Sequence, residues 1–357
     1  MTPIAELLRE LVAINSVSSV SNRPVIEFVK AQLPGPTAEF AYVDAHGVEK
    51  VNCVFGAANA RLALVCHTDT VPFDETLTAH ADTEKVFGRG SCDTKGFLAA
   101  AITALGRAEA RPSEVSLVLT ADEEIGCVGA KHLLAERAIS PRYAIVGEPT
   151  GLQPIRGGKG YGLAEVIVTG REAHSAFPEL GVSAISRAAR LIGEIEEFSR
   201  ELQADSDMSF SPPFTTINIG KISGGTAKNV IAGECRFLVE WRPIPAQDPR
   251  LLADRLRDLV GDLGRVEVQR AERGFATPAE SPFVKLFERE TSQRAGSVSF
   301  GTEAPQLTAL GAETIVFGPG SMTVAHTSGE FVPIVELERC AHVLTRLISQ
   351  VAERRQA

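Results

Sequence analysis

Five short polar clusters contain the side-chain types that bind metal ions and transfer protons. Each follows a predicted strand or opens a predicted helix, and their sequences are HTD (67–69), GRGSCDTKG (88–96), TADEEIG (120–126), IVGEPT (145–150) and GPGSMTVAHTSGEFV (318–332). In open α/β sheets, binding sites form beyond the carboxyl ends of the strands. The placement of the clusters therefore predicts that they meet at one edge of a sheet.

Taken one at a time, the clusters also allow simpler interpretations. Asp69 could begin a turn before Pro72, and Asp93 could cap the helix that it precedes. A lone histidine in a glycine-rich loop is more often a surface residue than a ligand. Three consecutive acids at 122–124 beside a buried strand, however, are costly unless a positive group binds them.

Considered together, the clusters supply two imidazoles and three carboxylates: His67, Asp93, Glu124, Glu148 and His326. Mixed imidazole and carboxylate ligation suits zinc, cobalt or manganese. Five protein ligands are too many for one hydrolytic ion that keeps an open position. They fit two ions about 3.5–4 Å apart if one carboxylate bridges them. The sequence therefore predicts a site for two divalent metal ions.

The elements expected to position these residues begin with an alternation of strands and helices. Apolar runs predict buried strands at 62–66, 115–120 and 143–146, and helical periodicity predicts helices at 3–14, 23–33, about 95–110 and 127–138. Such alternation indicates an α/β fold with a mixed, largely parallel sheet sandwiched by helices.

From about residue 160 the pattern changes to β-α-β-β-α-β, the order of a ferredoxin-like α+β module. Its strands are expected near 163–169, 214–222, 233–241 and 265–270, and its helices near 181–203 and 249–263. A helix near 281–293, strands near 297–299 and 313–317 and a helix at 334–352 then complete the first domain. We therefore expect a metal-binding domain formed by residues 1–158 and 273–357, with an inserted domain at 159–272.

Composition limits the classes of partner. The 357 residues include 36 Lys and Arg against 45 Asp and Glu, a formal net charge of −9, so neither nucleic acid nor an anionic membrane is expected to bind. No run of about 18 apolar residues predicts a membrane span, and the N-terminus lacks the pattern of a secretory signal. Six scattered cysteines without a CxxC pair favour a cytoplasmic location. A nucleotide-binding sheet is disfavoured because no GxGxxG follows the first strand and no GxxxxGK[ST] occurs.

In the type and order of these motifs, nearly the whole chain resembles the zinc-dependent deacylases and carboxypeptidases of the aminoacylase, succinyl-diaminopimelate desuccinylase and acetylornithine deacetylase family. The resemblance implies a zinc-exopeptidase-like fold and two metal ions, zinc or alternatively cobalt. It implies that His67, Asp93 and Glu148 bind one ion. It also implies that Asp93, Glu124 and His326 bind the other, so that Asp93 bridges the two.

The same resemblance assigns roles beside the ligands. Glu123 corresponds to the general base, and Asp69 to the carboxylate that orients His67. Family members also tend to have a cis peptide bond after the bridging aspartate, here Asp93–Thr94. His174, in GREAHSAFP, resembles a histidine that polarises the scissile carbonyl, often in the active site of the partner subunit. The inserted domain is accordingly expected to act as a lid and to form a homodimer.

The strings TADEE, GEPTGLQPIRGGKG, GTEAP (301–305) and GPGSMTVAH are similar to those of the acetylornithine deacetylases within this family. This implies removal of the acetyl group from an N-acetylated amino acid, with N2-acetyl-L-ornithine in arginine biosynthesis as the expected substrate. The strings SCDTKG and TSGEFV depart from the usual pattern and leave substrate choice open. Alternatives are deacetylation of N-acetylcitrulline or N-acetyl-lysine, succinyl-diaminopimelate desuccinylation, dipeptide cleavage, or a catalytically silent metal-binding relative.

The expected substrate contacts are Asn229, Arg242, Gly320, Ser321 and Glu303. Asn229 and Arg242 resemble contacts to the substrate carboxylate, which a planar guanidinium binds with two hydrogen bonds. Gly320 and Ser321 could offer backbone N–H groups to the same carboxylate. Charge complementarity suggests that Glu303 faces the ammonium group of an ornithine side chain.

Overall fold

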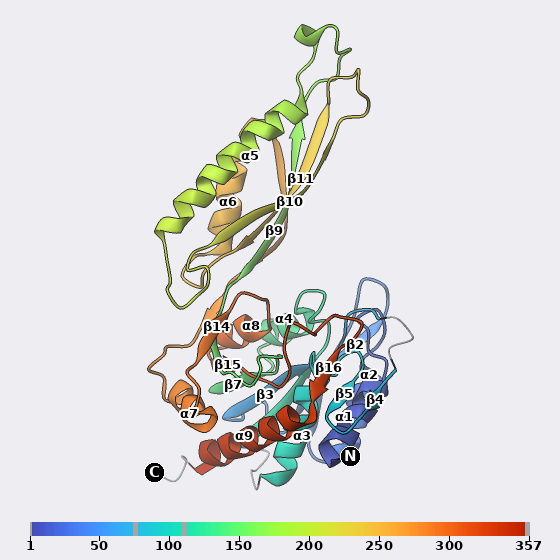
Figure 1. The fold of residues 1–357 in the computed structure, drawn as a ribbon, viewed down its shortest axis with the longest axis vertical. Helices are drawn as coiled ribbons and strands as arrows, with labels where there is room; N and C mark the ends of the chain where they lie inside the picture. Colours follow the sequence, from blue (N-terminus) through green and yellow to red (C-terminus); the bar gives the residue numbers. More distant parts are fainter. Residues whose placement is uncertain (1, 74–77, 109–112, 354–357) are drawn as a thin grey trace. The chain divides into compact units, whose positions relative to one another are not determined.

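The computed structural model describes residues 2–73, 78–108 and 113–353 and divides the chain into two compact units (Figure 1). Unit 1 consists of Met1–Arg156, Ala276–Gly296 and Thr302–Ala357. Unit 2 consists of Gly157–Phe275 and Ser297–Gly301. The second unit is thus inserted into the sequence of the first.

Unit 1 is built on a central mixed sheet. Its strand order is β1 (Thr37–Val43), β2 (Glu49–Phe55), β6 (Val115–Thr120), β3 (Leu62–His67), β7 (Tyr143–Val146), β15 (Glu313–Val316), β8 (Ile155–Gly158) and β13 (Phe275–Ala276), with β14 (Gly296–Val298) pairing β8. Strands β6, β3, β7 and β15 run parallel, and their register places His67 opposite Thr120 and Val146 opposite Val316. The carboxyl ends of these four strands therefore lie side by side.

Helices cover this sheet, as Figure 1 shows. They are α1 (Pro3–Ala13), α2 (Arg23–Gln32), α3 (Lys95–Arg107), α4 (Val128–Ala135), α7 (Pro282–Thr291), α8 (Ala304–Ala309) and α9 (Ile334–Glu353). Helix α3 packs against α1, α9 and β3, whereas α4 packs against α8 and β2. A small sheet of β16 (Phe331–Pro333), β5 (Lys85–Phe87) and β4 (His80–Ala81) lies beside them. The expected α/β fold is confirmed; of the helix expected at about 95–110, positions 109 and 110 fall outside the described residues.

Close packing of α3 places the loop that precedes it against the sheet. Phe97 and Leu98 of α3 are buried with Leu64 and Ile145 in one hydrophobic core. At Gly147, just after β7, an added Cβ would lie 2.1 Å from the Phe97 ring, so only glycine permits this approach. The loop before α3 is therefore held close to the strand ends.

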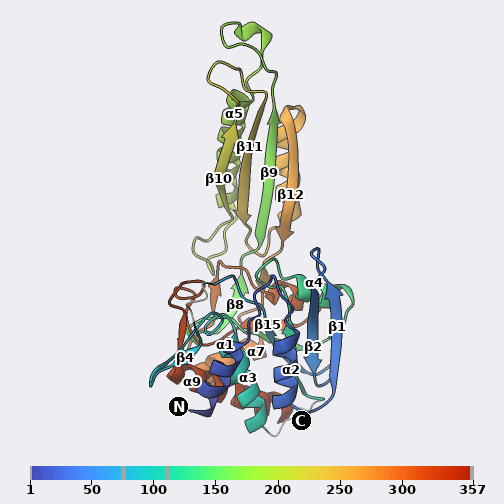
Figure 2. The ribbon, with the colours of Figure 1, turned by 90° about the vertical axis from the view of Figure 1, so that its right-hand side faces the viewer.

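Unit 2 is an antiparallel four-stranded sheet with two helices on one face (Figure 2). In chain order its elements are β9 (Tyr161–Thr169), α5 (Ala184–Glu201), β10 (Thr216–Gly224), β11 (Glu234–Arg242), α6 (Pro249–Val260) and β12 (Gly264–Glu272). The sheet order is β10-β11-β9-β12, so β10 and β12 form its edges. This is the expected β-α-β-β-α-β order.

Three short 3-10 helices accompany these elements: Pro178–Leu180, Leu202–Ala204 and Gly261–Leu263. The core of unit 2 forms where α5 and α6 cover the sheet, and Trp241 and Phe237 are its largest buried side chains. Among the described residues, no helix combines the length and hydropathy that a membrane span needs.

Candidate metal centre

Four of the five candidate ligands lie at or beyond the carboxyl ends of the four parallel strands. His67 is the last residue of β3, Glu124 follows β6, Glu148 follows β7, and His326 lies in the loop after β15. This convergence follows from the parallel register, because each chain leaves the sheet at the same edge. The sequence separation between these residues is therefore no obstacle to a common site.

Asp93, the fifth candidate, lies between the two histidines. Its Oδ1 is 3.0 Å from His67 Nε2 and its Oδ2 is 3.2 Å from His326 Nε2. The alternative role of helix cap is not observed, because the N-cap of α3 is Thr94. The Asp93–Thr94 peptide bond is cis, in agreement with the resemblance.

Two groups of potential ligand atoms are formed in this way. In each group the atoms lie within 4.8 Å of one another, and the groups are His67, Asp93, Glu148 and Asp93, Glu124, His326. Asp93 belongs to both. His326 Nε2 is also 3.2 Å from Glu124 Oε1, which closes the second group. These groups coincide with the two ligand sets that the family resemblance implied, and Asp93 is common to both.

The electrostatics of the site fit divalent cations. His67, Asp93 and Glu148 are only 2%, 5% and 4% exposed. Burial, with Asp93 and Glu123 nearby, raises the pKa of Glu148 well above its ordinary value. Hydrogen bonds to Asp93 and Glu124 raise the pKa of His326 to about 10. Carboxylates crowded in a buried site demand a compensating positive charge, and an ion bound by this mixed donor set would provide it.

Asp69 connects His67 to the turn that carries two consecutive glutamates. Its carboxylate accepts hydrogen bonds from the backbone N–H groups of Glu123 (3.0 Å) and Glu124 (3.3 Å) and from the Ser18 hydroxyl (2.7 Å). The nearest Asp69 atom to His67 Nδ1 is therefore the backbone oxygen, at 3.0 Å, whereas Oδ1 is 3.6 Å away. Asp69 thus faces the imidazole with both its backbone oxygen and its carboxylate, and its carboxylate also fixes the 123–124 backbone.

Glu123 lies beside the ligands but belongs to neither group. The Cys127 thiol donates to its Oε1 at 3.3 Å. Burial and the neighbouring carboxylates raise the pKa of Glu123 to about 8, although His67 opposes the shift. The preceding residue, Asp122, has a φ of 58° and forms a buried ion pair with Lys50 at 2.9 Å. A carboxyl group that is held near a metal site without ligating can accept and return a proton.

Glu303 is the buried member of the expected substrate contacts, with 1% exposure. The Thr120 hydroxyl donates to its Oε2 at 2.8 Å, and Oε1 has no hydrogen-bond partner among the residues that the structure describes. Burial raises the pKa of Glu303 to about 7. A buried carboxylate oxygen without a hydrogen-bond partner would be stabilised by a cationic group of a bound ligand.

The other expected contacts in unit 1 form bonds of their own. Gly320 donates its N–H to Glu336 at 2.7 Å, so that group is already engaged and does not point to a substrate. Ser321 forms an isolated backbone bridge with Thr150, and its hydroxyl lies 2.9 Å from that of Thr323.

The remaining expected residues lie in unit 2. His174 accepts a hydrogen bond from the Ala176 N–H through Nδ1 at 3.1 Å, and the Asn229 backbone oxygen accepts one from Ser175. Arg242 is paired with Glu240 at 2.7 Å and stacks over the Tyr161 ring. These contacts are those of an arginine in a local ion pair with a neighbouring residue of the same strand.

Sequence analysis missed several residues that support the site. Ser18, Lys50, Arg89 and Glu330 are buried and hold the loops that carry the candidate ligands. Glu330 alone had a visible signal, as the single acid in TSGEFV four residues after His326. The partners of the others come from distant segments, so no local pattern marks them.

A sequence profile decides the family. The profile of peptidase family M20/M25/M40 matches residues 63–350, a span that includes all five candidate ligands. The chain belongs to peptidase family M20/M25/M40.

Several relatives match this chain along nearly its whole length. An acetylornithine deacetylase from Myxococcus xanthus is 47% identical over 363 residues, 96% of each chain, and one from Proteus mirabilis is 33% identical over 96% of this chain and 95% of the relative.

Solved structures show the same M20 fold. Aminopeptidase PepT from Bacillus cereus superposes with a TM-score of 0.80 over 98% of both chains, at 22% sequence identity. An M20 metallo-carboxypeptidase from Sulfolobus solfataricus superposes with a TM-score of 0.76 over 99% of this chain and 100% of the other, at 17% identity. At these identities the likeness concerns the fold.

Proposed function

We propose that this chain hydrolyses N2-acetyl-L-ornithine to L-ornithine and acetate, a reaction of arginine biosynthesis. The observation that carries the proposal is the convergence of two histidines and three carboxylates around a shared aspartate, with Glu123 beside them and free of ligation. The substrate follows from the 47% identity to an acetylornithine deacetylase over 96% of both chains.

The metal ions in this proposal are two divalent cations, zinc or alternatively cobalt. His67, Asp93 and Glu148 would hold one, and Asp93, Glu124 and His326 the other. When bound, such ions lower the pKa of a bound water and polarise an acyl oxygen.

The side chains of the protein supply proton transfer and orientation. Glu123 removes a proton from the attacking water and returns it to the departing amine, as a carboxyl group beside the ligands can do. Asp69 keeps the backbone of Glu123 in place through the 3.0 Å hydrogen bond. His174, contributed by a second subunit, donates to the acyl oxygen as negative charge develops on it. Asn229, Arg242 and Ser321 are proposed to contact the substrate carboxylate.

Glu303 is proposed to select the side-chain ammonium of acetylornithine. The wild-type enzyme is expected to have a higher kcat/KM for N2-acetyl-L-ornithine than for N-acetyl-L-methionine, which lacks the ammonium. Glu303→Gln should raise KM for acetylornithine about tenfold or more, because a hydrogen bond to a charged group contributes roughly 1.5–3 kcal/mol. Steady-state kinetics with both substrates, with metal present, measure the difference.

The pH dependence provides a second readout for Glu303. Its pKa is raised to about 7, so protonation below that pH removes the charge that balances the ammonium, and KM for acetylornithine should rise as the pH falls. In Glu303→Gln this rise should disappear. Equal effects on both substrates would refute the assignment. Faster turnover of N-acetylcitrulline, a succinylated substrate or a dipeptide would show that acetylornithine is not the preferred substrate.

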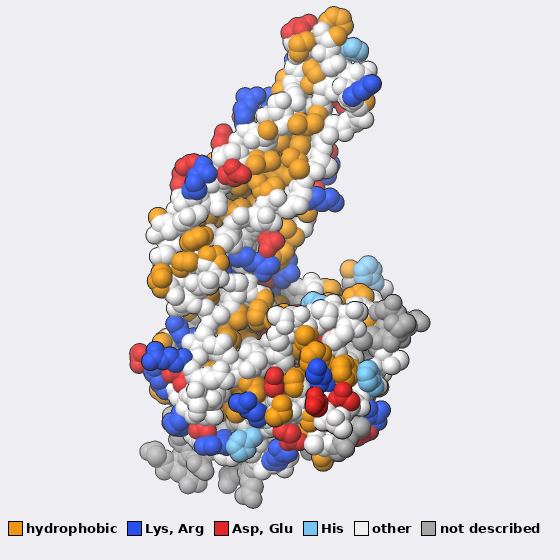
Figure 3. All heavy atoms as spheres, viewed as in Figure 1, with side chains coloured by type: hydrophobic (Ala, Val, Ile, Leu, Met, Phe, Trp, Pro, Cys, Tyr) orange, Lys and Arg blue, Asp and Glu red, His pale blue; other side chains and the backbone are white. Residues whose placement is uncertain are grey.

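We further propose a homodimer formed through unit 2. Strand β10 is an edge of the four-stranded sheet, and such an edge offers unpaired backbone groups to another strand. Ile222 of β10 is 52% exposed, and Figure 3 shows hydrophobic side chains at the surface of unit 2 near this strand. A second copy of the chain would cover both.

Ile222→Lys tests this dimer, because a charge on each facing edge opposes pairing. Analytical ultracentrifugation should show wild-type dimers and mutant monomers, and kcat should fall about 10²-fold if His174 acts in the partner's site. Leu251→Lys, which replaces another exposed apolar residue of unit 2, is the control and should remain dimeric. A monomeric wild-type enzyme, or an active monomeric mutant, would contradict the proposal.

A cytoplasmic location completes the proposal. All six cysteines lie in the part of the chain that the structure describes, where they are buried and form no disulfide, as expected in a reducing compartment. The net charge of −9 supports a small-molecule substrate rather than nucleic acid or a membrane surface as the partner.

A further inference from the structure

Glu330 joins two loops of the candidate metal centre. Its Oε1 accepts the backbone N–H groups of Cys92 (3.0 Å) and Asp93 (3.1 Å), and its Oε2 is paired with the Arg89 guanidinium. Its side chain is fully buried, and that of Arg89 is 8% exposed. Its backbone oxygen also accepts the N–H of Gly88. One residue thereby holds the whole 88–93 segment.

The position of Glu330 in the chain explains why this matters. It lies four residues after His326 and directly before β16. Strand β16 pairs with β5, which ends at Phe87, directly before the 88–93 segment. Asp93 can bridge two ions only if both of its oxygens face the correct histidines, now at 3.0 and 3.2 Å. The backbone orientation at residue 93 sets those directions. A carboxylate that accepts from this peptide therefore controls the bridge.

We propose that Glu330 is a positioning residue for the bridging aspartate, with Arg89 as the cation that holds its carboxylate in place. This inference rests on the proposed two-metal function. It predicts that Glu330 acts on the affinity for both ions, because the ligand that it orients is shared by both. A purely structural buried ion pair would change folding stability without changing metal affinity.

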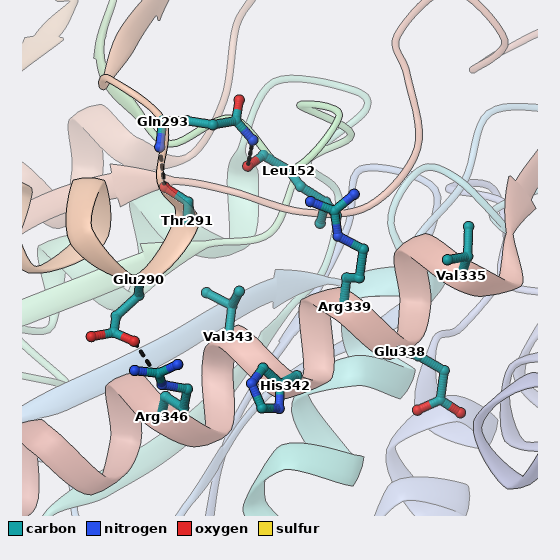
Figure 4. A pocket seen from close by; sticks show the side chains of 10 residues that line it. All are labelled: Leu152, Glu290, Thr291, Gln293, Val335, Glu338, Arg339, His342, Val343 and Arg346. Atoms are coloured by element: carbon teal, nitrogen blue, oxygen red, sulfur yellow. Dashed lines mark hydrogen bonds and ion pairs between the residues drawn. The ribbon is translucent and has the colours of Figure 1, made fainter.

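An ion pair with a buried glutamate elsewhere in unit 1 offers a control. Glu290 of α7 has a fully buried side chain and is paired at 2.7 Å with Arg346 of α9, whose side chain is 56% exposed. Figure 4 shows this pair at a pocket between α7 and α9 that is also lined by Arg339 and His342. Neither Glu290 nor Arg346 contacts a candidate ligand in the interactions that the structure describes.

Two double variants isolate the oxygen that accepts from the Cys92 and Asp93 N–H groups. Arg89→Met with Glu330→Gln retains an amide oxygen that can accept from both, whereas Arg89→Met with Glu330→Met retains none. Both variants remove the whole ion pair and conserve volume, a replacement that buried pairs often tolerate without loss of stability. Glu290→Met with Arg346→Met applies the same change to the control pair.

The measurement is competition between each metal-free protein and a chromophoric chelator for Zn²⁺, with Co²⁺ absorption as a report on coordination. The Glu330→Met double variant should bind both ions about 10–100-fold more weakly than the Glu330→Gln double variant. Its Co²⁺ spectrum should change as well. The control double variant should match the wild type within about twofold in both experiments.

Equal metal affinities in the two Glu330 double variants would overturn the proposal, as would an equal loss in the control. Thermal unfolding of the metal-free proteins verifies that each is folded. If the Glu330→Met double variant does not fold, Glu330→Asp with Arg89 retained replaces it, because the shorter carboxylate withdraws the acceptor and keeps a cation opposite the charge; it should lose affinity for both ions, and unchanged affinity would refute the inference. A wild-type protein that takes up fewer than two ions would instead refute the two-metal function itself.

Discussion

Glu123→Gln should lower kcat for N2-acetyl-L-ornithine by about 10²–10⁴-fold, the usual contribution of a general base. The amide retains the size of the carboxylate but cannot take a proton from water. Because Glu123 belongs to neither ligand group, both metal ions should remain bound. Steady-state kinetics together with elemental analysis of the purified protein measure the two effects in one sample.

A matched control for this variant is Glu136→Gln, which changes an exposed glutamate after α4 in the same way. Its kcat should equal that of the wild type. Turnover of Glu123→Gln within tenfold of the wild-type value would show that another group moves the proton. A loss of metal would show instead that Glu123 is a ligand.

Asp93→Ala should cost the protein both metal ions, since Asp93 is the residue common to the two ligand groups. We expect at least a 10³-fold loss of kcat/KM, because several kcal/mol of transition-state stabilisation come from the metals. Glu148→Ala, which removes a ligand from one group alone, should lose one ion and keep affinity for the other. Metal analysis after gel filtration distinguishes these outcomes.

Removal of the metals from the wild-type enzyme gives the corresponding reversible experiment. Exhaustive chelation should abolish hydrolysis, and addition of Zn²⁺ or Co²⁺ should restore it with a stoichiometry of two. Activity that survives chelation would contradict the two-metal proposal. Full activity after addition of one metal ion per chain would show that only one of the two ligand groups binds a catalytic ion.

The fully buried parallel strands were predictable because their residues are almost all apolar. β1 and β2 were not predicted, although they extend the same sheet. In β2 the apolar pattern is interrupted by Lys50 and Asn52, both buried. Lys50 pairs with Asp122, and Asn52 accepts the N–H of Ala121, so these polar residues serve the loop that carries the candidate base. Sequence periodicity has no means of recognising a polar residue whose partner is far away in the chain.

The candidate ligands were predictable for a similar physical reason. Histidines and acids directly after apolar strands share one sheet edge, so their convergence follows once the sheet is parallel. The contacts that hold the ligands in place could not be predicted from the sequence in the same way. Asp69 was expected to orient His67 by its carboxylate, which lies 3.6 Å from the imidazole. The hydrogen bonds of that carboxylate to the N–H groups of Glu123 and Glu124, and the nearer backbone oxygen, were not expected. Which oxygen of a residue meets which donor depends on the folded backbone.

The division of the ligands around the inserted unit has a consequence for how the enzyme matures. His67, Asp93 and Glu148 all precede residue 157, whereas His326 follows the whole insertion. On the ribosome, the candidate ligands of one group are therefore complete after less than half of the chain has been made. The donors of the other are incomplete until the final segment emerges. A prematurely terminated chain lacks both His326 and Glu330, so under the proposed function hydrolytic competence arises only when synthesis is nearly finished.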